Sequence, residues 1–207
     1  MKNVKKIIVI MFAFLLAILA GVGCFLYFNK DKLNTAANEY NIASATLESI
    51  DMYQKRYFDI VKRNNLFFDL EGSDNSARDV AELKKLFEEV KAKIDKNCPQ
   101  YIVYEEISTK YRNNTGRNTL EMNDFAKEKY DAFDKLLNDT YKAVKDRISE
   151  NDFILLKESQ RNWLHEVEDY NKIYLAQGFG TIGTLIKFDY EINMRAFRTL
   201  LLMLYLN

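Results

Sequence analysis

The chain has few residues that interrupt or cross-link a fold. Its 207 residues include one proline, seven glycines and two cysteines, against 27 phenylalanines and tyrosines. Because proline and glycine are the residues that most disfavour a helix interior, their scarcity favours long helices joined by aromatic contacts. One of the two cysteines, Cys24, lies in an apolar run, which leaves Cys98 without an intramolecular partner. We therefore expect no intramolecular disulfide in the soluble part, core packing alone to stabilise it, and Cys98 to be a spectator thiol, with a disulfide between two chains as the alternative.

The chain also lacks a charge excess and a recognisable catalytic set. Lysine and arginine number 30, as do aspartate and glutamate, and no basic stripe with interleaved aromatics indicates nucleic-acid binding. The only histidine, His165, has just Glu168 and Asp169 at helical spacing, too few ligands for a specific metal site. We predict no metal, no cofactor, no catalytic residues and no enzymatic activity.

Gly178-Phe179-Gly180-Thr181-Ile182-Gly183 matches the glycine pattern of dinucleotide sites letter for letter. In those sites the pattern follows a strand and opens a helix. Here it follows a helical segment, so we interpret it as a turn between two helices, capped by Thr181 or Thr184.

The longest apolar run, Ile7 to Phe28, is 22 uncharged residues preceded by Lys2, Lys5 and Lys6. At about 1.5 Å per residue it is long enough to cross a bilayer. We expect an uncleaved anchor with a cytoplasmic N-terminus and everything after Lys32 outside the cytoplasm, on the periplasmic or extracellular side. A cleaved signal peptide is the alternative, and Cys24 after small residues leaves a lipoprotein as a third. Residues 33–207 carry 25 basic and 29 acidic residues, a balance that favours a cationic partner.

Apolar residues at steps of three and four predict an all-α fold, an up-and-down antiparallel helical bundle with one N-terminal transmembrane helix. We divide the chain into a stub and anchor (1–32), a helical N-terminal region (33–118) and a C-terminal helical domain (119–207). The expected helices, with residues 101–118 as a short helix or connector, run over about 35–70, 76–96, 119–148, 152–176 and from Thr181 or Thr184 to Leu206. Thr119 is the expected cap of the third.

The C-terminal region also contains residues that an apolar helix stripe does not need. They occur in a fixed order: Thr119-x-Glu121-Met122-Asn123, Asp134, Leu137-Asn138-x-x-Tyr141, Leu156-x-x-x-Gln160-Arg161-x-Trp163, Gly178-x-Gly180-Thr181 and Arg198. In this combination, residues 119–206 resemble the lysozyme-inhibitor LprI-like family of bacterial extracytoplasmic domains. The family's usual cysteines are replaced here by Phe125, Asn171 and Tyr190, and an arginine common in the family is Val167.

The resemblance implies a small helical domain that binds and inhibits lysozyme. We therefore expect a membrane-anchored binding protein of the bacterial envelope that protects the cell wall, its partner lysozyme or another envelope protein. The alternative is a structural tether that assembles with membrane proteins and has no affinity for lysozyme. Neither hypothesis predicts the oligomeric state. The candidate binding residues are Asn138, Tyr141, Gln160, Arg161, Trp163, Gly178, Gly180, Thr181 and Arg198.

Overall fold

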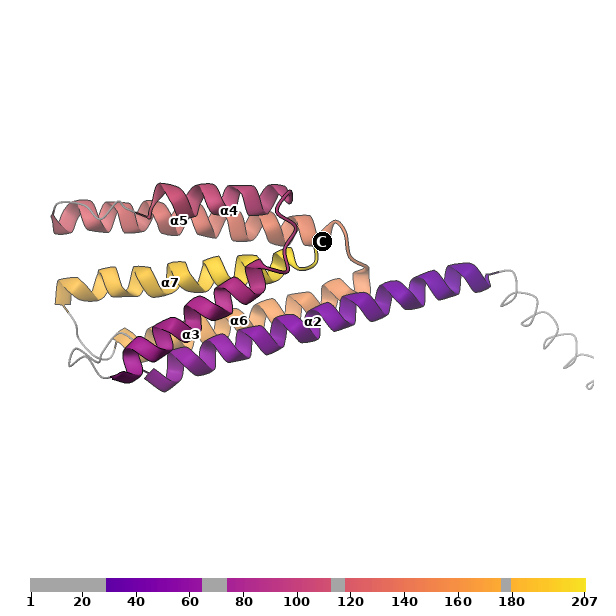
Figure 1. The fold of residues 1–207 in the computed structure, drawn as a ribbon, viewed down its shortest axis with the longest axis horizontal. Helices are drawn as coiled ribbons and strands as arrows, with labels where there is room; N and C mark the ends of the chain where they lie inside the picture. The colour runs from indigo at the N-terminus through magenta and orange to yellow at the C-terminus, as the bar shows by residue number, and fades with distance from the viewer. Residues whose placement is uncertain (1–28, 65–73, 113–117, 176–179) are drawn as a thin grey trace, which may run out of the picture. The chain divides into compact units, whose positions relative to one another are not determined.

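The computed structural model describes residues 29–64, 74–112, 118–175 and 180–207. Every regular element within these ranges is a helix, which confirms the all-α prediction (Figure 1). The helices are α2 (Lys30–Asn64), α3 (Asp74–Lys91), α4 (Pro99–Lys110), α5 (Thr119–Lys145), α6 (Glu150–Leu175) and α7 (Gly180–Met203).

The expected membrane anchor, residues 7–28, lies outside the described residues. None of the helices that are described is both long and apolar enough to span a bilayer. The chain divides into two compact units, Met1–Ile42 and Ala43–Asn207. The described residues of the first unit belong almost entirely to the opening turns of α2, and the second unit contains the rest of α2 and all later helices.

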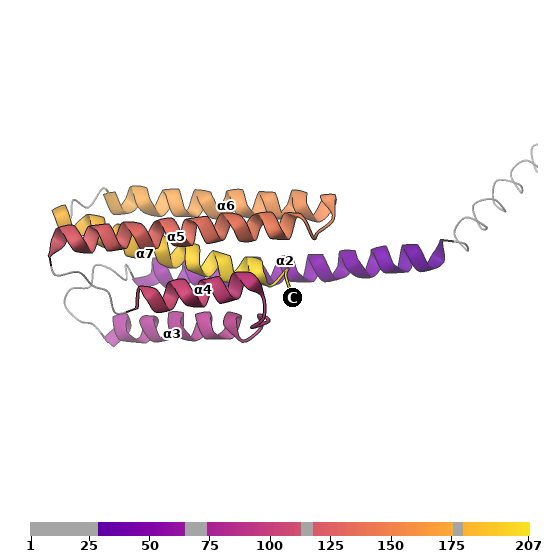
Figure 2. The ribbon, with the colours of Figure 1, turned by 90° about the horizontal axis from the view of Figure 1, so that it is seen from above.

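Helix α7 is the central helix of the second unit. It packs most extensively against α5 and also contacts α3, α4 and α6. Figure 1 places it between the pair α4 and α5 and the helices α2, α3 and α6, and the view in Figure 2 places it between α5 and α6 on one side and α3 and α4 on the other. Its last turns are buried on every side, as the complete burial of the four consecutive residues 200–203 shows. A helix surrounded in this way needs apolar residues all round, and Leu200-Leu201-Leu202-Met203 supplies them.

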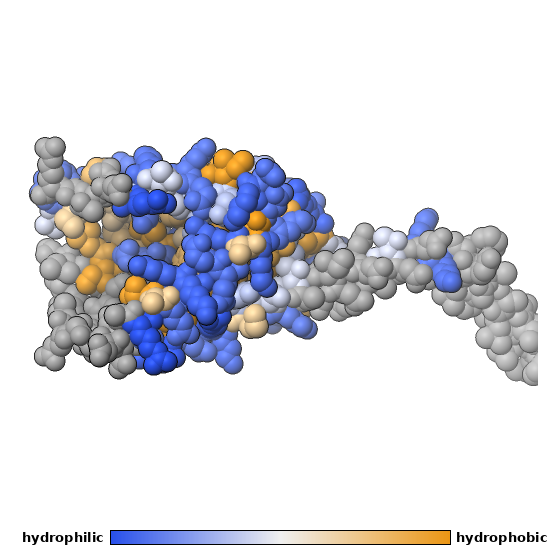
Figure 3. Space-filling view, viewed as in Figure 1, coloured by the Kyte–Doolittle hydropathy of each residue, from blue (hydrophilic) through white to orange (hydrophobic). Residues whose placement is uncertain are grey.

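The outer helices bury one stripe each. On α6 this stripe consists of Leu156, Trp163, Val167 and Tyr170, the residues that the helical periodicity predicts. Hydrophilic residues cover most of the face seen in Figure 3, with separate hydrophobic patches between them. Stacked or edge-on aromatic pairs join the helices, for example Tyr57 on α2 with Phe197 on α7, whose ring centroids are 4.8 Å apart.

Three helix boundaries depend on residues just outside the helix. Pro99 begins α4 instead of ending the preceding helix, since its missing N–H is unneeded in the first turn. Asn118, and not Thr119, caps α5: its side-chain oxygen accepts a hydrogen bond from the Glu121 backbone N–H at 3.0 Å. Ser149 caps α6, because its hydroxyl oxygen accepts from the Asp152 N–H at 3.2 Å. Cys98, next to Pro99, is buried and unpaired.

Candidate functional site

Two of the predicted residues, Gln160 and Arg198, meet inside the bundle. Arg198 is 1% exposed and lies on the central helix α7. Its Nε donates to Gln160 Oε1 at 2.9 Å and its Nη2 donates to Ser159 Oγ at 3.1 Å, both on α6. Its Nη1 donates to Gln54 Oε1 on α2. The planar guanidinium presents its donors in a fixed fork, so these bonds tie three helices together in one geometry.

The Ser159 hydroxyl connects the positive charge of Arg198 to the negative charge of Asp51. The Ser159 hydroxyl donates to Asp51 Oδ1 on α2 at 2.8 Å while accepting from Arg198. Burial lowers the pKa of Arg198 to about 10, and the negative charge of Asp51 is the largest effect in the opposite direction. The arginine is therefore protonated at neutral pH. We call Arg198, Gln160, Ser159, Gln54 and Asp51 the Arg198 cluster.

The side chains of the Arg198 cluster are bonded to one another. Its only hydroxyl, Ser159, is buried, donates to the Asp51 carboxylate and accepts from Arg198, so its bonds are all made within the cluster. Within the described ranges, no three His, Cys, Asp or Glu residues gather as metal ligands would. What the cluster can do is hold α2, α6 and α7 in register.

The other candidate binding residues do not lie together in one site. Trp163 is 3% exposed and belongs to the core. Tyr141 is half-buried against Phe153, with ring centroids 5.8 Å apart. Asn138 and Arg161 are exposed, and Asn138 bonds only within its own helix, donating to the Asp134 carbonyl at 2.9 Å.

The glycine segment is described in part. Gly178 lies outside the described residues, Gly180 is the first residue of α7, and Thr181 follows in the first turn of that helix.

Two noncovalent contacts join α6 and α7 nearer to that segment. The rings of Tyr170 and Tyr190 stack with centroids 3.9 Å apart, and Asn171 Nδ2 donates to Glu191 Oε1 at 2.6 Å. Asn171 and Tyr190 are two of the residues that stand where the family resemblance expects cysteines. Stacking and hydrogen bonding thus connect these two helices at the positions of Asn171 and Tyr190.

A polar groove of about 530 Å³ lies between α2 and α6, over the Arg198 cluster. Asp51, Gln54 and Ser159 line it, and the Lys62 ammonium crosses it to Glu166 Oε2 at 2.6 Å. Sequence reasoning did not identify Asp51 or Gln54 as site residues. Their only signal is that they lie one turn apart, each directly after a buried residue, Ile50 or Tyr53, a pattern common to many solvated helix edges.

Residues 111–202 match the model of a family described as Lysozyme inhibitor LprI. The match confirms the resemblance inferred for residues 119–206. No curated protein and no solved structure gives a significant match to the chain.

Proposed function

We propose, from the LprI domain at residues 111–202, that this protein binds and inhibits lysozyme. We propose further that the apolar run at residues 7–28 anchors it in the membrane and that the helical part lies outside the cytoplasm. The observation that carries the function is the family match itself, because the family is described as a lysozyme inhibitor. The length and flanks of the apolar run support the location.

The structure separates residues that build the domain from residues that can touch a partner. Arg198 and Trp163 are buried, so their part in the function is to hold the helices. Direct contact is left to exposed residues, of which Arg161 on α6 is one. A surface held rigid before binding loses less conformational entropy when the complex forms, which favours tight association.

We propose the connection between α6 and α7, residues 177–183, as the segment that enters the concave substrate cleft of lysozyme. Residues 177–179 lie outside the described ranges, and the argument rests on the helices at either end. The stack of Tyr170 on Tyr190 and the bond between Asn171 and Glu191 join these helices near the connection. A short segment held at both ends is suited to a concave site.

Charge supports a cationic partner. Residues 33–207 carry four more acidic than basic side chains. Complementary charge raises the rate of encounter more than it strengthens the final complex, so salt is expected to slow association with lysozyme.

The test of the function is the digestion of bacterial cell walls by lysozyme. The full chain, purified into lipid nanodiscs, is expected to slow digestion at micromolar excess, whereas empty nanodiscs have no effect. Undiminished digestion at that excess would refute the function.

The contact segment is tested separately with Phe179→Ala. This variant is expected to weaken inhibition without changing the free energy of unfolding. Met52→Ala is the matched control, since Met52 is 56% exposed on α2 and remote in sequence from the connection. If Phe179→Ala inhibits as well as the parent protein, the connection is not the contact segment, even where the protein itself inhibits.

A further inference from the structure

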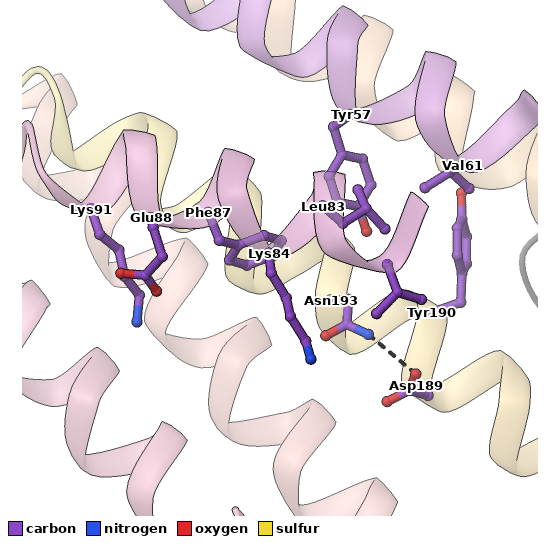
Figure 4. Close-up of a pocket in the computed structure, with 11 residues that line it drawn as sticks. Tyr57, Val61, Leu83, Lys84, Phe87, Glu88, Lys91, Asp189, Tyr190 and Asn193 are labelled. Carbon is purple, nitrogen blue, oxygen red and sulfur yellow. Dashed lines mark hydrogen bonds between the residues drawn. The ribbon is translucent and has the colours of Figure 1, made fainter. Parts of the chain in front are cut away.

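A cavity of about 440 Å³ opens between α2, α3 and α7 (Figure 4). Its floor consists of buried residues: Tyr57 and Val61 from α2 and Tyr190 from α7, each no more than 3% exposed. Its rim carries the exposed side chains Lys84 and Asp189. The cavity therefore has an apolar, aromatic interior and a charged mouth, as small-molecule sites commonly do.

The hydroxyl of Tyr57 is a polar group inside this cavity with no protein partner. Tyr57 is 3% exposed and its hydroxyl is directed toward the cavity (Figure 4), and within the described part of the chain it makes no hydrogen bond to another side chain or to the backbone. The stack on Phe197 and a tilted contact with Phe87, centroids 6.3 Å apart, hold the ring in place. A hydroxyl that opens into a cavity and makes no bond to the protein can bond to an atom of a ligand.

The mouth of the cavity has a carboxylate with spare capacity as an acceptor. Asp189 accepts one hydrogen bond, from Asn193 Nδ2 at 3.2 Å, and no described cation lies within ion-pair distance of it. Its pKa is raised by desolvation, while the more distant Lys129 and the bond from Asn193 act in the other direction. Burial raises the pKa of Tyr57, and the negative charge of Asp189 raises it further. A positive group at the mouth would stabilise this carboxylate.

We propose that the cavity binds a small amphipathic amine, whose apolar or aromatic body enters the cavity and whose ammonium head binds Asp189 at the mouth. The body lies among Tyr57, Phe87 and Tyr190, and the ammonium donates to the Asp189 carboxylate and the Tyr57 hydroxyl oxygen. Aromatic walls add to the attraction, because the ring faces carry negative charge density.

The charges at the mouth favour an amine over an acid. Lys84 is exposed on a long flexible stem and can point its ammonium into water. Lys91, which also lines the cavity, is paired with Glu105 at 2.9 Å. Asp189 has no such ion pair, so it is the group that gains most from a charged ligand. A lysine side chain of a protein partner fits less well, because it would carry its charge first into the apolar floor.

The cavity is formed partly by residues inside the LprI match and partly by residues before it. Its α7 wall falls within the LprI match at residues 111–202, whereas its α2 and α3 walls come from residues before that match. The inference does not rest on lysozyme binding, and either proposal can fail while the other stands.

The test is calorimetric titration of the full chain in nanodiscs with three ligands of similar size: phenethylamine, phenethyl alcohol and hydrocinnamate. We expect phenethylamine to bind about tenfold more tightly than the alcohol, the difference that one charge-assisted hydrogen bond makes, and hydrocinnamate to bind most weakly. Empty nanodiscs measure partition into lipid and are subtracted.

Two conservative variants assign the head group. Asp189→Asn is expected to lower the affinity for phenethylamine to that for the alcohol and to leave the alcohol unchanged. Tyr57→Phe is expected to weaken phenethylamine several-fold. Asp139→Asn is the matched control, because it removes an exposed carboxylate on α5 that lies outside the cavity.

Three results would overturn the proposal. They are no binding of phenethylamine beyond that to empty nanodiscs, hydrocinnamate binding as tightly as the amine, and a preference for the amine that survives Asp189→Asn. Unchanged binding by Tyr57→Phe would remove the role given to that hydroxyl.

Discussion

Replacing Arg198 tests most directly how the helices are held together. Arg198→Ala removes the donor of three hydrogen bonds and leaves Gln160, Gln54 and Ser159 with unused acceptors in or near the core. Removing a long buried side chain leaves a cavity and hydrogen-bond acceptors without their donor, and together these cost about 3–5 kcal/mol. Set against a typical total stability of about 5–15 kcal/mol, that loss is a large fraction.

A second variant separates the loss of charge from the loss of volume. Arg198→Met keeps most of the side-chain length and removes the buried charge along with its desolvation cost. The partners can also recover some solvation, since Asp51 is exposed and Gln54 and Gln160 are half-buried. We expect Arg198→Met to destabilise the fold by less than Arg198→Ala, by about 1–3 kcal/mol.

The assay is urea unfolding of the full chain in nanodiscs, followed by far-ultraviolet circular dichroism. Arg161→Ala is the control, because Arg161 is the neighbour of Gln160 but is exposed, and its loss is expected to stay within about 0.5 kcal/mol. If Arg198→Ala costs less than about 1 kcal/mol, or no more than Arg161→Ala, the Arg198 cluster does not hold the helices in register.

Two further predictions concern a helix cap and the buried tyrosines. Asn118→Ala is expected to lower the free energy of unfolding by about 1 kcal/mol, because the side chain of Asn118 accepts from the Glu121 N–H. Thr119→Ala is expected to leave the free energy of unfolding nearly unchanged. Urea midpoints that fall equally for both variants would contradict the assignment of Asn118 as the cap. Raising the pH above 10, the ordinary tyrosine pKa, is expected to lower the urea midpoint. Burial raises the pKa of Tyr57 and Tyr190 above that value, so the unfolded chain loses these protons first and stability falls as pH rises. A midpoint that is constant while tyrosinate absorbance grows would show that these hydroxyls ionise within the fold.

Helical periodicity predicted the buried side of the helices well where one face meets the core. On α6, Leu156, Trp163, Val167 and Tyr170 occur at helical spacing and are buried, because residues at steps of three and four share a face whatever the helix packs against. Met122 on α5 is at helical spacing from Phe125 yet is 39% exposed. It lies near the start of the helix, where the apolar stripe runs past the end of the core.

Helix ends were predicted less well, since adjacent residues compete for the same role. Asn118 and Thr119 both carry a side chain that can cap α5, and the sequence alone favoured the second. The backbone of Asn118 is extended, with φ near −146°, as a capping residue requires, while Thr119 is already helical. Which of two neighbours takes the extended conformation depends on how the preceding chain approaches the helix.

The sequence predicted some residues of the Arg198 cluster and missed others. Gln160 and Arg198 were selected as parts of a family pattern, and the structure places them 2.9 Å apart. Their partners Gln54 and Asp51 come from a region that the pattern does not cover, and Gln54 is 144 residues from Arg198. A charged residue next to an apolar run such as Leu200-Leu201-Leu202 indicates that it has a partner without showing which residue that partner is.

The sequence by itself determined that the chain is helical, that residues 119–206 resemble an LprI domain, and that Arg198 belongs to the ordered pattern that carries this resemblance. Each follows from the local spacing and order of residues, which persist in any packing. Only the tertiary structure decided that Arg198 bonds to α2 as well as α6, and that Tyr57 and Asp189 share a cavity. These depend on how α7 lies against α2 and α3, a choice made by the summed packing of many side chains and not by any one segment.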